Sequence, residues 1–91
     1  MDNQEKIKKV CDYVKHTLLE KNNLYGDAAL KPLGVFNKQP ASNSILIRLD
    51  DKLNRIKNID EPRKNDIFDM IGYLTLYCVS KGWDNFNDQI D

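Results

Sequence analysis

The sequence contains few of the residues that nucleophilic catalysis and metal binding most often use. It has two cysteines and a single histidine among 91 residues. His16 follows Lys15 and is expected on a solvated face, so neither a catalytic triad nor a histidine-rich metal site is expected. Cys11 and Cys78 fall at apolar positions of helical patterns, and no second metal ligand stands nearby. We interpret them as small core residues in a reducing compartment rather than as a disulfide or a zinc pair.

The sequence also lacks net charge and long apolar runs. Its 14 basic and 14 acidic residues cancel at neutral pH, so there is no general electrostatic reason to bind duplex nucleic acid or an anionic membrane, although a local patch is an open alternative. The longest apolar stretch, MIGYLTLYCV, is too short to span a bilayer. The first residues, MDNQEKIKK, have no apolar run behind their charges and do not resemble a signal peptide. We expect a cytoplasmic protein.

What the sequence does contain is helical periodicity. Apolar residues recur three and four positions apart over residues 3 to about 21, from 42 or 44 to 57, and from about 62 to 81. The third stretch is apolar on most sides, which is typical of a central helix or of one that also contacts a partner subunit. We predict one all-α domain over residues 1–91, with a core at about 3–83 and a polar tail at 84–91. Small size and extra aromatic residues favour a homo-oligomer.

The ends of these helices have recognisable cap signals. Asp2 with Glu5 resembles a capping box. Ser42 or Asn43 can cap the second helix, and Asp60 or Glu61 can cap the third, with Pro62 at its first position. Gly82 is expected to end the third helix, with Trp83 folding back in a Schellman motif. The first helix should end near residues 22–23.

A connection of unusual length joins the first two helices. Residues 24–42, LYGDAALKPLGVFNKQPAS, contain two glycines and two prolines together with apolar and aromatic residues. A short helical turn is predicted at residues 27–31, which Pro32 would stop. A connection this long is uncommon in a small domain unless it has a function. Either it folds back onto the core, or it forms a lid or wall of a pocket.

Charged and aromatic side chains form matching rows on the second and third predicted helices. We call these rows the polar ladder. Because the short connection near residue 60 makes the two helices antiparallel neighbours, residues whose numbers add up to about 121 face each other. With Asp51 beside the ladder, this register predicts three pairs: Arg55 with Asp66, Lys52 with Asp69, and Arg48 with Tyr73.

The polar ladder has two interpretations. It can be an interhelical ion-pair network that fixes the register, although buried ion pairs often only break even against apolar residues. It can instead line a pocket, where arginine and lysine bind phosphate oxygens and the aspartates orient them or hold Mg²⁺. In that case Tyr25 and Tyr73 could stack on a base or bind a sugar.

The same residues resemble a known family. Tyr-Gly, then Arg-x-x-Asp-Lys-x-x-Arg, then Asp-x-x-Asp-x-x-Gly-Tyr is similar to the small phage and bacterial family called nucleotide modification associated domain 1. The similarity covers about residues 20–80 and implies a phage-type role in nucleotide metabolism without an established reaction. The motif positions in this sequence are Tyr25, Gly26, Arg48, Asp51, Lys52, Arg55, Asp66, Asp69, Gly72 and Tyr73.

A more distant resemblance is to the all-α, MazG-like nucleoside triphosphate pyrophosphohydrolases. Their Mg²⁺ is held by a Glu-Glu-x-x-Glu helix and a Glu-x-x-Asp helix. Asp66 and Asp69 could replace the second motif, but the first has no counterpart here. We therefore expect a small nucleotide-binding protein, accessory to nucleotide modification or sequestering a nucleotide. The alternatives are a Mg²⁺-dependent pyrophosphohydrolase and a structural or protein-interaction module without a nucleotide ligand.

Overall fold

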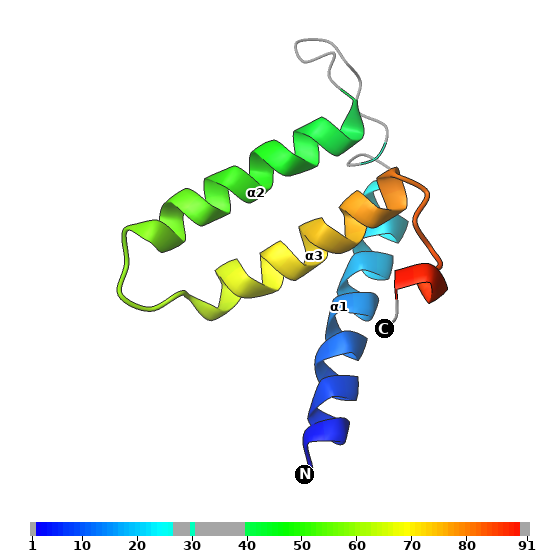
Figure 1. Cartoon of the computed structure of the whole chain (residues 1–91), viewed down its shortest axis with the longest axis horizontal. Coiled ribbons are helices and arrows are strands. Elements are labelled where there is room, and N and C mark those ends of the chain that lie inside the picture. Colours follow the sequence, from blue (N-terminus) through cyan, green and yellow to red (C-terminus); the bar gives the residue numbers. More distant parts are fainter. Residues whose placement is uncertain (1, 27–29, 31–39, 90–91) are drawn as a thin grey trace.

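A computed structural model of the chain describes residues 2–26, 30 and 40–89, and these residues form an all-α fold. The helices are α1 (Asn3–Tyr25), α2 (Ala41–Lys57) and α3 (Lys64–Ser80), followed by one 3₁₀ turn, η1 (Asn87–Gln89). Figure 1 shows α2 and α3 side by side as an antiparallel hairpin. The predicted fold class and the hairpin are both confirmed. None of the helices in these ranges is long and apolar enough to cross a membrane.

The core is small and lies along α3, which packs against both α2 and α1. Among the described residues, the buried apolar side chains are Ile45 and Leu49 of α2 and Val14 of α1. The C-terminal half of α1 lies against α3, whereas its N-terminal turns extend beyond the hairpin (Figure 1). Cys11 lies on this extension and is exposed. The prediction that Cys11 is a core residue is therefore wrong. The apolar stripe of α1 extends beyond the part of the helix that packs against α3, and Cys11 lies on this extension. Cys78 is half-buried.

Asp2 caps α1 as predicted, but the other end of the helix differs from the prediction. The Asp2 carboxylate accepts a hydrogen bond of 2.8 Å from the Glu5 backbone N–H. The helix continues past residue 23 to Tyr25, and Gly26 follows with a φ of 64°. Asn22 Nδ2 donates to the carbonyl oxygen of Gly26 at 3.2 Å. The two extra residues place Tyr25 in the last turn of α1, where it lines the pocket described below.

The predicted side-chain caps of α2 and α3 are wrong. Helix α2 begins at Ala41, one and two residues before the predicted caps Ser42 and Asn43, and Pro40 at its N-cap provides no side-chain hydrogen bond. The Pro40 carbonyl accepts hydrogen bonds from the backbone N–H groups of Asn43 and Ser44, at 3.0 Å and 3.2 Å. The connection uses residues 58–63, so α3 begins two residues after Pro62, beyond the reach of the predicted caps Asp60 and Glu61.

The C-terminus of α3 has the predicted Schellman motif. The Trp83 N–H donates to the Cys78 carbonyl at 2.8 Å, and the Gly82 N–H donates to the Val79 carbonyl at 3.0 Å. Gly82 has a φ of 72°, a conformation that residues with a Cβ rarely adopt. The Trp83 ring then packs edge-on against Tyr77, with 5.8 Å between ring centroids.

Two glycine substitutions should have opposite effects on stability. We expect Gly82→Ala to reduce the free energy of unfolding by about 1–2 kcal/mol, because alanine must adopt the left-handed conformation. Gly72, inside α3, has ordinary helical geometry, and a Cβ there would lie 3.6 Å from Leu18 Cδ2, a normal contact. We expect Gly72→Ala to increase stability by up to about 1 kcal/mol through helix propensity. Urea unfolding measures both, and a gain on Gly82→Ala would contradict the motif.

Candidate functional site

Lys52 is the central polar residue of the α2–α3 hairpin. Its Nζ lies 2.9 Å from Asp69 Oδ2 and 3.2 Å from Asp66 Oδ1. We call these three residues the Lys52 cluster. Lys52 is 9% exposed and Asp66 is 3% exposed, so the ammonium group and one carboxylate are withdrawn from solvent. Hydrogen bonds from the ammonium to Asp69 and then to Asp66 raise the pKa of Lys52 above its ordinary value.

The predicted register is correct, and two of the three predicted pairs are confirmed. Lys52 pairs with Asp69, and the Arg48 guanidinium lies 5.9 Å from the centre of the Tyr73 ring. The third predicted pair, Arg55 with Asp66, is wrong because Asp66 binds Lys52 instead.

The reason for the failed pair is the position of each residue around α2. Lys52 continues the buried stripe of Ile45 and Leu49, at spacings of seven and three, and points directly at α3. Arg55 lies to one side of that stripe and is exposed. Within the described part of the chain it has no ion pair.

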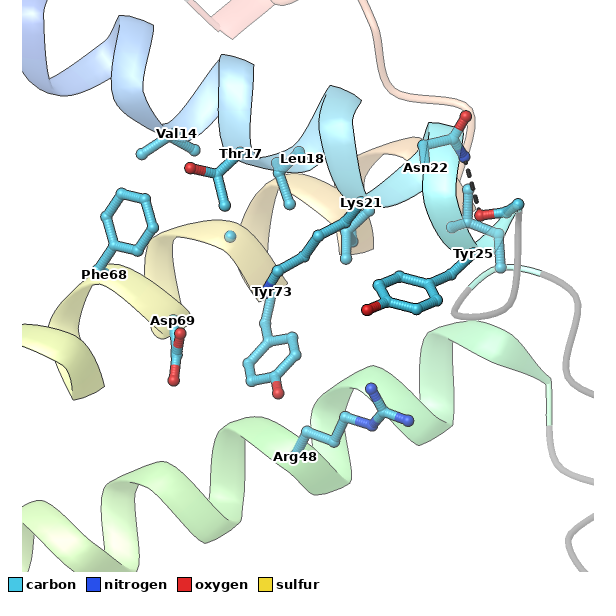
Figure 2. Close-up of a pocket in the computed structure, with 14 residues that line it drawn as sticks. Val14, Thr17, Leu18, Lys21, Asn22, Tyr25, Arg48, Phe68, Asp69 and Tyr73 are labelled. Atoms are coloured by element: carbon cyan, nitrogen blue, oxygen red, sulfur yellow. Dashed lines mark hydrogen bonds between the residues drawn. The ribbon is translucent and has the colours of Figure 1, made fainter.

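A pocket lies between the C-terminal half of α1, one face of α3 and Arg48 of α2. Its volume is about 330 Å³, at the small end of the range for ligand sites. Apolar side chains form its floor, and two tyrosines and two cationic side chains stand around it (Figure 2). The lining residues are Val14, Thr17, Leu18, Lys21, Asn22, Tyr25, Gly26, Leu30, Arg48, Phe68, Asp69, Gly72, Tyr73 and Leu76.

Arg48 is the cation best placed to bind a ligand in this pocket. Figure 2 shows its guanidinium pointing from α2 toward the rings of Tyr73 and Tyr25. Beyond its contact with the Tyr73 ring, Arg48 has no hydrogen bond or ion pair to the residues that the structure describes. Arginine carries five N–H donors in a planar group. The N–H donors of Arg48 can therefore bind an anion. Lys52, in contrast, already directs two of its three N–H donors to the carboxylates of Asp66 and Asp69.

Five of the residues predicted for the site line this pocket: Tyr25, Gly26, Arg48, Asp69 and Tyr73. The other predicted site residues do not line it. Lys52 and Asp66 lie behind it in the Lys52 cluster, and Arg55 and Asp51 are exposed outside it. The predicted role of Lys52 and Arg55 as phosphate ligands is therefore not supported by their positions.

Sequence reasoning missed Lys21, which lines the pocket from the end of α1. A signal for it was present in the sequence. Lys21 follows Val14 by seven residues and Leu18 by three, so a lysine stands on the apolar stripe of α1. The helical turn predicted at residues 27–31 lies outside the described residues, as does most of the long connection that was predicted either to fold back onto the core or to form a lid or wall of a pocket. Leu30 is described, and it lines the pocket.

The residues predicted either to orient the basic side chains or to hold Mg²⁺ are Asp51, Asp66 and Asp69. Asp66 and Asp69 hold the Lys52 ammonium between them, so a cation at this position would have to displace it. Asp51 is exposed, and the described ranges contain no group of three or more histidine, cysteine or acidic residues that could hold a metal ion. Mg²⁺ binding stays a prediction.

Comparison of the sequence with family models finds no match, and comparisons with curated proteins and with solved structures find no significant match. The resemblance to the nucleotide modification associated family is neither supported nor contradicted by these comparisons. We therefore infer the function from the geometry of the pocket.

Proposed function

We propose that the pocket between α1, α2 and α3 binds a small anionic ligand with an aromatic ring, of the nucleotide class. The observation that carries this proposal is Arg48, an arginine without a carboxylate partner in the described structure, which faces a pocket beside two tyrosines. Lys52, which links the two helices, has two acidic partners, whereas Arg48 contacts the Tyr73 ring. The pocket can supply donors for a phosphate and surfaces for a ring.

In this proposal, each group of the ligand is matched with lining residues of suitable chemistry. Arg48 binds the phosphate through paired N–H donors, and Lys21 adds a second positive charge from α1. Tyr25 and Tyr73 contact the base or sugar. The apolar floor, which includes Leu18 and Phe68, excludes water beneath the ring.

The Lys52 cluster supports this site, and of its three residues Asp69 alone lines the pocket. It holds α2 and α3 at the spacing that brings Arg48 opposite Tyr73. Because Asp66 and Asp69 are engaged with Lys52, we propose binding without turnover, in a phage-type protein that assists nucleotide modification or sequesters a nucleotide. Mg²⁺-dependent hydrolysis would require both carboxylates to release Lys52.

A thermal-shift screen tests this proposal. Nucleoside mono-, di- and triphosphates, the corresponding nucleosides and inorganic phosphate are each added with and without Mg²⁺. We expect at least one nucleotide to raise the melting temperature by several degrees, since ligand at 100 times its Kd adds about 2.7 kcal/mol of stability. Nucleosides and phosphate alone should give smaller shifts, because each fills only half of the site.

Three outcomes of this screen, and of a pyrophosphate-release assay on any nucleotide that binds, decide between the functions. A nucleotide that shifts the melting temperature equally with and without Mg²⁺, and is recovered intact after incubation, agrees with a binding protein. Release of pyrophosphate that depends on Mg²⁺ and is abolished by Asp69→Asn would instead establish the pyrophosphohydrolase alternative. No shift with any nucleotide would reject nucleotide binding and leave the structural module.

A further inference from the structure

The pocket carries opposite charges at its two ends. Among the described residues its lining includes two cations, Arg48 and Lys21, and one acidic residue, Asp69. Figure 2 shows Asp69 and Phe68 at one end of the pocket, whereas Arg48 and Tyr25 lie at the other end. A bound molecule therefore meets the guanidinium of Arg48 at one end and a carboxylate at the other.

Asp69 has an acceptor atom that the described part of the protein does not use. Its Oδ2 lies 2.9 Å from Lys52 Nζ, and Oδ1 has no hydrogen bond or ion pair within the described residues. The Asp69 side chain is 36% exposed, against 5% for Asp66, so a molecule in the pocket can reach it. An ionised carboxylate only accepts hydrogen bonds. A ligand group that binds Oδ1 must therefore be a donor.

The charge of the Lys52 cluster decides which part of a ligand can lie beside Asp69. One ammonium group against two carboxylates leaves the cluster with a net charge of −1. A phosphate beside Asp69 would be repelled by this charge. The same phosphate beside Arg48 meets a cation that has no carboxylate partner in the described structure. The pocket therefore favours one orientation of an anionic ligand.

We propose that the pocket binds a nucleoside monophosphate in this orientation, with its phosphate on Arg48 and a hydroxyl or amino group donating a hydrogen bond to Asp69. This inference rests on the proposed function and narrows its ligand class. A monophosphate carries a charge of about −1.5 to −2 at pH 7, which Arg48 and Lys21 together balance. A volume of about 330 Å³ suits one nucleotide unit better than a dinucleotide.

Two parts of such a ligand carry the neutral donor that Asp69 requires, namely the ribose hydroxyls and the amino group of adenine or cytosine. Analogues that lack one or the other distinguish them. The probes are adenosine and cytidine monophosphate. Each is compared by calorimetry with its dideoxy form, which lacks the ribose hydroxyls, and with the form that has hydrogen in place of the amino group. We expect one of the two changes to raise the Kd at least about tenfold, because the carboxylate loses its hydrogen-bond partner.

Asp69→Asn tests whether Asp69 is the group that reads this donor. Lys52 Nζ requires an acceptor, so the amide oxygen of the variant faces Lys52 and its NH₂ group faces the pocket. The ratio of the two Kd values, analogue to parent nucleotide, should then fall to within about twofold. Asp66→Asn is the matched control and should keep the wild-type ratio, because Asp66 belongs to the same cluster but does not line the pocket. Both Kd values of a ratio come from one variant, so partial unfolding affects them equally.

The results that overturn this inference differ from those that overturn the proposed function. The inference fails if neither monophosphate binds, or if both analogues bind as tightly as the parent nucleotide. It also fails if Asp69→Asn keeps the wild-type ratio, or if Asp66→Asn lowers the ratio equally. In each case another nucleotide, or the same one held through Arg48 alone, can still occupy the pocket. The proposed function itself fails only if no nucleotide of the thermal-shift screen, the di- and triphosphates included, stabilises the protein.

Discussion

Replacing Lys52 with methionine is expected to lower the melting temperature on the order of 10 °C. Methionine fits the space of the lysine stem, so the substitution changes charge more than packing. It leaves Asp66, which is 3% exposed, and the neighbouring Asp69 without their shared ammonium partner. An uncompensated buried carboxylate is among the most costly defects a single substitution can introduce. Thermal unfolding followed by circular dichroism measures the effect.

Arg55→Met is the matched control for this prediction. Arg55 is one turn further along α2, exposed and without an ion pair in the described structure, so its replacement should change the melting temperature by no more than about 2 °C. Adding Asp66→Asn and Asp69→Asn to Lys52→Met should restore part of the lost melting temperature, because the two carboxylates that repel each other are replaced by neutral amides. Equal effects of Lys52→Met and Arg55→Met would show that the Lys52 cluster contributes no stability.

The contribution of Lys52 also predicts a dependence on pH. The pKa of Lys52 is raised in the folded state above its ordinary 10.5. Its stabilising effect is therefore fully present below pH 10.5 and is lost as the pH rises through the higher folded value. The difference in urea midpoint between wild type and Lys52→Met should be large at neutral pH and should narrow as the pH rises above 10.5. A constant difference would mean that lost packing, rather than lost charge, causes the destabilisation.

The sequence predicted the hairpin well because the constraints on it are local. Three helices follow from apolar periodicity, and a short connection forces α2 and α3 to be antiparallel. That register alone placed Lys52 opposite Asp69 and Arg48 opposite Tyr73. It failed for Arg55 because Arg48, Lys52 and Arg55 were treated as one face, although their directions around α2 differ by several tens of degrees. The long stem of Lys52 then reaches both carboxylates.

The pocket could not be predicted in the same way, because half of it comes from α1. The position of α1 against α3 depends on packing between residues far apart in sequence, such as Leu18 with Gly72. The connection between α1 and α2 is too long to fix the position of α1 through geometry. Lys21 and the apolar floor therefore enter the site only through tertiary structure.

Arg48→Gln should remove most of the stabilisation that a bound nucleotide gives. Glutamine keeps much of the length and polarity of the side chain but lacks the positive charge and the paired N–H donors. Arg48 has no carboxylate partner in the described structure and contacts the Tyr73 ring, so its loss should lower the melting temperature of the free protein by no more than about 5 °C. We expect the Kd for the nucleotide found by the screen, measured by calorimetry, to rise by at least about tenfold.

Three comparison variants separate the role of Arg48 from general electrostatics. Arg55→Gln removes the same charge from the same helix outside the pocket and should leave the Kd within about twofold of wild type. Arg48→Lys keeps the charge but not the planar pair of donors and should fall between wild type and Arg48→Gln. Lys21→Gln should weaken binding as well, since it lines the pocket from α1. Equal losses with Arg48→Gln and Arg55→Gln would mean that the ligand responds only to the charge of α2, and the pocket would not be its site.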